Sequence, residues 1–125
     1  MPLQNDPLAT QVIGLAIKVH RALGPGLLES AYEECLAYEL TKNNVPFGRQ
    51  VPLPLIYEEV RLDCGYRMDF VVDRQLLIEV KSLDRLLPIH DAQILTYLRL
   101  SGCRVGLLMN FNQEALRDGL RRFVL

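Results

Sequence analysis

Two short apolar segments that carry embedded charges constrain the fold more than any other part of the sequence. They cover residues 66–72 and 76–81, and only the polar run Asp73-Arg74-Gln75 separates them. Segments of this length that are rich in β-branched and aromatic residues are typical of strands, and a short polar break is typical of a hairpin. The sequence therefore predicts two paired strands, the second of which is central and buried because it begins Leu76-Leu77-Ile78.

The spacing of the charges in these strands predicts that they meet. If pairing across the loop begins with Val72 opposite Leu76, then Asp69 lies opposite Glu79, with Cβ atoms ~5 Å apart. Glu79 and Lys81 are two positions apart, so they share a face of their strand. This register is an assumption, because a slip of one residue would send Asp69 to the other face.

Two carboxylates and an ammonium on one face suit a hard divalent cation. Mg²⁺ prefers oxygen ligands, takes one or two carboxylates and keeps water or substrate phosphate in its other positions. The ion can polarise a phosphoryl oxygen and lower the pKa of bound water, while Lys81 orients that water or stabilises developing charge. The alternative is a set of solvated charges near strand ends. Apolar neighbours favour the metal site, since buried charges persist when they are paired or metal-bound.

A glutamate in the second predicted helix points to the same site. Asp6-Pro7 predicts a first helix, Gly24-Pro25-Gly26 breaks it, and a second helix is expected from about Leu27 to Lys42. Its predicted apolar stripe contains Leu28, Ala31, Tyr32, Cys35, Leu36 and Leu40. Glu29 shares the direction of Leu36 and Leu40, so we expect it to point toward the sheet and bind metal directly or through water. Alternatively, it is a first-turn glutamate favoured by the helix dipole.

The remaining pattern predicts a mixed sheet flanked by helices. A strand with two prolines is expected over residues 50–55, a turn over 57–60, a helix from Pro88 to about Leu100 and a buried strand over 105–109. A short helix is expected from Gln113, followed by an extended piece over 122–125. The predicted order is α-β-β-β-α-β after an extra N-terminal helix, in a single domain spanning residues 1–125, of which the first five look like a frayed end.

The third predicted helix carries three polar side chains on one stripe. His90, Gln93 and Tyr97 are spaced i, i+3, i+7. They could contact a substrate phosphate or base, or Gln93 and Tyr97 could instead hold Lys81 or Glu79 in place. We rank His90 lowest, since a lone helical histidine is more often structural.

Composition limits the partners. The net charge of −1 argues against strong non-specific capture of nucleic acid, although a local basic patch is compatible with it. Three separated cysteines indicate neither a disulfide framework nor a zinc site. A reduced Cys35 in the apolar stripe of the second helix predicts a cytoplasmic location. The absence of a long apolar run or a secretory signal predicts no membrane segment. A homodimer is compatible with so small a core.

Several motifs in the same order resemble those of the GxxExxY protein family. They are Gly26-Leu-Leu-Glu29-Ser-Ala-Tyr32, residues 66–72, Ile78-Glu79-Val80-Lys81, His90-Asp91-Ala92-Gln93-Ile94-Leu95-Thr96-Tyr97-Leu98 and residues 106–111. That family is grouped with the PD-(D/E)xK nucleases. The resemblance implies an α/β, restriction-endonuclease-like αβββαβ core with Asp69, Glu79 and Lys81 as its signature. It also implies Glu29 at the metal, a Q-x-x-x-Y element at Gln93 and Tyr97, and Tyr32 as a supporting residue. Met68 departs from the proline in the superfamily motif.

The expected function is a Mg²⁺- or Mn²⁺-dependent nuclease that hydrolyses phosphodiesters in DNA rather than RNA. Asp69, Glu79, Glu29 and the backbone carbonyl of Val80 would hold the metal, and Lys81 would serve the attacking water. Two other hypotheses stand beside it. One is a catalytically silent binding or assembly module with this fold, favoured by the near-neutral charge. The other is a site for a small nucleotide.

Overall fold

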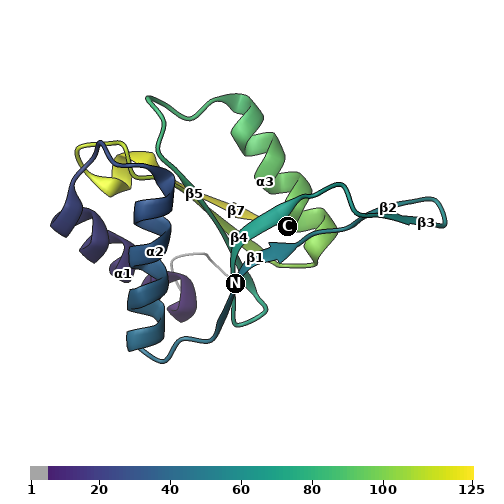
Figure 1. Cartoon of the computed structure of the whole chain (residues 1–125), viewed down its shortest axis with the longest axis horizontal. Helices are drawn as coiled ribbons and strands as arrows, with labels where there is room; N and C mark the ends of the chain where they lie inside the picture. Colours follow the sequence, from purple (N-terminus) through teal and green to yellow (C-terminus); the bar gives the residue numbers. More distant parts are fainter. Residues whose placement is uncertain (1–5) are drawn as a thin grey trace.

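A mixed five-stranded sheet separates two helices from a third (Figure 1). The computed structural model describes residues 6–125, so the frayed end expected over the first five residues lies outside the described part. The helices on one face are α1 (Pro7–Leu23) and α2 (Glu29–Lys42), and the helix on the other is α3 (Pro88–Ser101). This arrangement confirms the predicted α/β class with an additional N-terminal helix.

The order of strands in the sheet is β1-β4-β5-β6-β7. Their bounds are β1 (Phe47–Pro52), β4 (Arg67–Val72), β5 (Leu76–Lys81), β6 (Val105–Asn110) and β7 (Leu120–Val124). β5 and β6 run parallel and are joined through α3, whereas all other neighbours are antiparallel. A parallel pair requires such a crossover, which explains why the third helix lies between these two strands in the sequence.

The two faces of the sheet bury separate apolar clusters, and β5 contributes to both. Leu76, Ile78 and Val80 pack with α1 and α2, while Leu77 packs with Ile94 and Leu98 of α3. Because both faces of β5 are covered, its apolar run has no alternating polar positions before Glu79. The expected central, buried strand is therefore confirmed.

The second helix begins later than the sequence predicted. It starts at Glu29, and Leu28 before it is extended and 78% exposed. The amide of Leu27 donates to the Tyr32 hydroxyl at 3.1 Å, so this segment is tied into a loop. The expectation that Leu28 belongs to the buried stripe was therefore wrong, and the helix begins two residues after the expected start at about Leu27.

Two other segments differ from expectation. The predicted strand over residues 50–55 is divided: β1 ends at Pro52, and β2 (Leu55–Tyr57) pairs with β3 (Val60–Leu62) as a separate hairpin. The turn expected over 57–60 is confirmed, with Glu58 at a φ of 53°. At the C-terminus, the expected helix is only a short 3₁₀ turn, η2 (Leu116–Gly119). The residues that follow form β7, which completes the sheet against β6.

No helix among residues 6–125 is long and apolar enough to cross a membrane. The three cysteines are free: Cys103 is buried, Cys64 is exposed and Cys35 is half-buried, less enclosed than its place in the predicted stripe indicated.

Candidate functional site

The register of β4 and β5 brings the two predicted metal carboxylates together. Val72 pairs with Leu76, Val71 with Leu77, and Phe70 with Ile78. The assumed register is therefore confirmed, and the next positions along the two strands are Asp69 and Glu79.

At Asp69 and Glu79, hydrogen bonds from backbone amides to side-chain carboxylates replace the regular backbone hydrogen bonds between the two strands. The backbone amide of Asp69 donates to Glu79 Oε2 at 2.8 Å, and the amide of Val80 donates to Asp69 Oδ2 at 2.8 Å. Each carboxylate thus inserts between the strands and bonds to the opposite backbone. The two side chains are therefore fixed by backbone amides of β4 and β5.

Burial and mutual repulsion make this pair a poor place for two negative charges. Burial, followed by the charge of Asp69, raises the pKa of Glu79 from 4.5 to about 8. Burial also raises the pKa of Asp69, with a further contribution from the charge of Glu33. Lys81 acts in the opposite direction on both carboxylates. At neutral pH the metal-free pair therefore retains a proton, and a bound cation would displace it.

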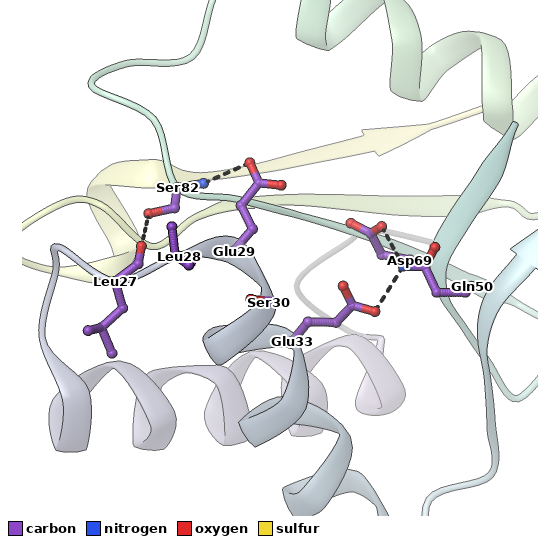
Figure 2. A pocket seen from close by; sticks show the side chains of 8 residues that line it. All are labelled: Leu27, Leu28, Glu29, Ser30, Glu33, Gln50, Asp69 and Ser82. Carbon is purple, nitrogen blue, oxygen red and sulfur yellow. Dashed lines mark hydrogen bonds between the residues drawn. The ribbon is translucent and has the colours of Figure 1, made fainter.

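A pocket of about 600 Å³ opens beside Asp69 (Figure 2). Its lining comes from the start of α2, from β1 and β4, and from the chain just after β5: Leu27, Leu28, Glu29, Ser30, Glu33, Gln50, Asp69 and Ser82. Two of the predicted site residues, Glu29 and Asp69, thus line the same space from different elements.

Glu29 lies beside the carboxyl end of the central strand β5 and is not buried beneath the sheet. It is exposed, and its Oε1 accepts a hydrogen bond from the backbone amide of Ser82 at 3.2 Å. The Ser82 hydroxyl donates to the carbonyl of Leu27 at 2.6 Å, which closes the link between α2 and the end of β5. The expectation that Glu29 follows the buried stripe was wrong because the helix starts at this residue. Its carboxylate nevertheless faces the pocket (Figure 2).

Tyr32 supports the loop that leads to Glu29. Its ring is fully buried and stacks on Phe111, with centroids 4.6 Å apart. Its hydroxyl donates to the carbonyl of Gly24 at 2.6 Å and accepts from the amide of Leu27 at 3.1 Å. The tyrosine therefore spans the glycine-rich loop from inside the core and does not line the pocket.

The three predicted residues of α3 have different surroundings. Tyr97 is half-buried, and its ring centroid lies 6.2 Å from that of Tyr66. Burial and then the charge of Glu79 raise the pKa of Tyr97. Gln93 is exposed and makes no side-chain hydrogen bond within the described residues. His90 Nδ1 accepts from the Leu87 amide at 2.8 Å and so caps the helix.

Glu33 and Gln50 belong to the pocket but were not predicted. Glu33 lies one helical turn after Glu29, so the i, i+4 spacing could have identified it. Gln50 Nε2 donates to Glu33 Oε1 at 2.9 Å and to Asp69 Oδ1 at 3.2 Å. No sequence pattern indicates this contact, because it depends on an unusual backbone conformation at Gln50.

The donor set fits a hard divalent ion with few protein ligands. Within residues 6–125, no three His, Cys, Asp or Glu side chains cluster closely enough to hold one ion by themselves. Two adjoining carboxylates, Asp69 and Glu79, are the set that Mg²⁺ or Mn²⁺ accepts when water and phosphate complete its coordination. Soft ligands are missing from the pocket lining, which argues against zinc.

Comparison with known proteins gives one match. The family model described as PD-(D/E)XK nuclease superfamily matches residues 6–123, nearly the whole chain. No curated protein and no solved structure matches the chain significantly. The matched span includes the helix glutamate, both strand carboxylates and the lysine two positions after Glu79. The fold has the central hairpin and crossover helix expected of a restriction-endonuclease-like protein, and the chain belongs to the PD-(D/E)XK nuclease superfamily.

Proposed function

We propose that this protein is a Mg²⁺- or Mn²⁺-dependent phosphodiesterase that cleaves nucleic acid, with DNA preferred over RNA. The main support is the interlocked pair Asp69 and Glu79. Each carboxylate accepts from a backbone amide of the opposite strand, and the pKa of each is raised. Membership of a nuclease superfamily supports a nuclease-type activity. A divalent ion would supply positive charge next to both carboxylates.

Asp69, Glu79 and the backbone carbonyl of Val80 would hold the ion, and Glu29 would act on it through water from the edge of the pocket. When bound, the ion supplies Lewis-acid polarisation of the phosphoryl group and a water of lowered pKa. Lys81 lies on the strand that carries Glu79, two positions further along. It orients the attacking water and stabilises the charge that develops on the phosphate.

We propose that residues of α3 serve the substrate or the carboxylates. Tyr97 and Gln93 share one stripe of the helix, and the charge of Glu79 contributes to the raised pKa of Tyr97. We assign both to contacts with the substrate or to support of the carboxylates. Tyr32 supports the loop before Glu29, and His90 contributes through its cap to the position of α3.

A second candidate is a binding module with this fold and no catalysis. The net charge of −1 favours it, because non-specific grip on a duplex normally relies on an excess of basic residues. In that case the carboxylate pair would be a remnant of the fold, and the protein would bind its partner without cleaving it. A homodimer and a cytoplasmic location also stay predictions from the sequence.

Cleavage assays separate the two candidates. Labelled single-stranded and duplex DNA, and RNA of the same sequence, are incubated with Mg²⁺, Mn²⁺ or EDTA. We expect metal-dependent products that Asp69→Asn eliminates and Asp63→Asn leaves unchanged, since Asp63 is an exposed acid before β4. Wild-type protein that binds Mn²⁺ and cuts none of these substrates would favour the binding module.

A further inference from the structure

Gln50 interrupts β1 directly beside the site. Its φ is 52°, a conformation that residues other than glycine rarely adopt. The neighbouring pairs in the β1–β4 register are Arg49 with Phe70 and Val51 with Met68. Gln50 therefore occupies the position that faces Asp69, where regular pairing is broken.

At this point, side chains two positions apart on β1 point to opposite faces of the sheet, and the same is true on β4. Arg49 reaches Glu33 on α2, whereas Val51, two positions later, packs with the α3-side cluster. On β4, Phe70 and Met68 divide between the two clusters in the same way. Residues two apart on a regular strand share a face. The chain is thus twisted at Gln50 and Asp69, which leaves both side chains at the mouth of the pocket.

The Gln50 amide joins two carboxylates that would otherwise repel. Its nitrogen donates to Glu33 Oε1 at 2.9 Å and to Asp69 Oδ1 at 3.2 Å, and a carboxamide has the two hydrogens that this requires. Figure 2 shows Gln50 beside Asp69, with Glu33 reaching toward them from α2. Glu33 is itself held by Arg49 Nε at 2.9 Å. Glu33 therefore holds the Gln50 amide in place beside Asp69.

Both oxygens of Asp69 are consequently oriented by neighbouring strands. Oδ2 accepts from Val80 on β5, and Oδ1 accepts from Gln50 on β1. We propose that Gln50 is a positioning residue for the metal site, which fixes the plane of the Asp69 carboxylate through its amide. This inference rests on the proposed metal-dependent function. Partners of this kind, which bond a metal ligand without touching the metal, typically change metal affinity by about 10–100-fold when removed.

Two substitutions separate the amide from the backbone twist. Gln50→Gly removes the amide and adopts the positive φ without strain, whereas Gln50→Ala removes the amide and keeps the strain. Isothermal titration with Mn²⁺, without substrate, measures affinity directly, and thermal unfolding measures stability. We expect Mn²⁺ to bind at least about 10-fold more weakly to both variants. We also expect the glycine variant to be the more stable of the two.

Glu34→Gln is the matched control. Glu34 bonds Arg49 as Glu33 does, but it is exposed and makes no contact with Gln50, so its Mn²⁺ affinity should equal that of the wild type. Wild-type affinity in Gln50→Gly and Gln50→Ala would overturn the inference and leave the metal site intact. If wild-type protein shows no Mn²⁺ binding that depends on Asp69, the inference and the proposed function are overturned together.

Discussion

Asp69 and Glu79 hold each other across two strands: the amide of Asp69 donates to Glu79 Oε2 at 2.8 Å, while Asp69 Oδ2 accepts from the amide that follows Glu79. Neither carboxylate can turn away to solvent without giving up a backbone hydrogen bond. Burial, with the charge of Asp69 acting on Glu79, raises the pKa of both groups, although these backbone hydrogen bonds act in the opposite direction. The raised pKa values agree with the role assigned to a cation.

Replacing Lys81 should remove activity without unfolding the protein. Lys81 is half-buried, and its positive charge opposes the raised pKa values of Asp69 and Glu79. We expect Lys81→Ala to lower kcat by about 100-fold or more, because a charge-stabilising donor is lost. The measurement is metal-dependent cleavage together with circular dichroism. Lys81→Met, which keeps the apolar stem, should be equally inactive. Substantial cleavage by either variant would show that the lysine is not needed for the chemistry.

The stability of the metal-free protein should fall as pH rises from about 5 to about 8. The pKa of Glu79 is raised from 4.5 to about 8, so the folded chain holds a proton that the unfolded chain has released over this range. Stability from this group is therefore fully present below pH 4.5 and lost as pH rises through 8. Urea unfolding at several pH values measures the effect.

Glu79→Gln tests whether Glu79 causes this pH dependence of stability, because glutamine keeps a hydrogen-bond acceptor for the Asp69 amide and does not ionise. We expect the variant to be more stable than wild type at pH 8 and to lose most of the pH dependence. Glu59→Gln, in the exposed β2–β3 turn, should retain the wild-type slope. An unchanged slope in Glu79→Gln would locate the titrating group elsewhere.

Removing the Tyr32 hydroxyl should loosen the loop that precedes Glu29. Tyr32→Phe keeps the stacking on Phe111 but leaves the half-buried Gly24 without a donor for its carbonyl and Leu27 without an acceptor for its amide. We expect a loss of about 1–3 kcal/mol in the free energy of unfolding, measured by urea titration. Tyr38→Phe, an exposed tyrosine on the same helix, is the control and should change it little. Equal effects of the two substitutions would contradict the assigned role.

His90 should contribute to stability more than to cleavage. Its ring accepts the Leu87 amide at the start of α3, so His90→Ala should cost about 1 kcal/mol of stability. We expect kcat to stay close to the wild-type value at a temperature where both proteins are folded. His90→Gln, which can accept the same amide from the third position of the helix, should recover part of the stability. A large fall in kcat in the glutamine variant would instead favour contact with substrate.

The sequence by itself determined the central hairpin and the meeting of Asp69 with Glu79. Strand periodicity of two and a three-residue loop fix which residues face each other, and these are local properties of the chain. The buried character of β5 also followed from its composition, since a strand covered on both faces has no solvent-facing positions. Tertiary structure supplies the helices that cover the two faces of this strand.

Contacts between distant segments decided the rest of the site. The start of α2 depends on the link between Tyr32 and the loop before it, and the position of Glu29 depends on the Ser82 amide at the end of β5. Gln50 meets Asp69 only because the chain is twisted at a positive φ. β7 forms only because β6 offers an edge. Local patterns do not predict such features, because each depends on how the chain folds back on itself: Glu29 and Ser82 are 53 residues apart in the sequence, and Gln50 and Asp69 are 19 apart.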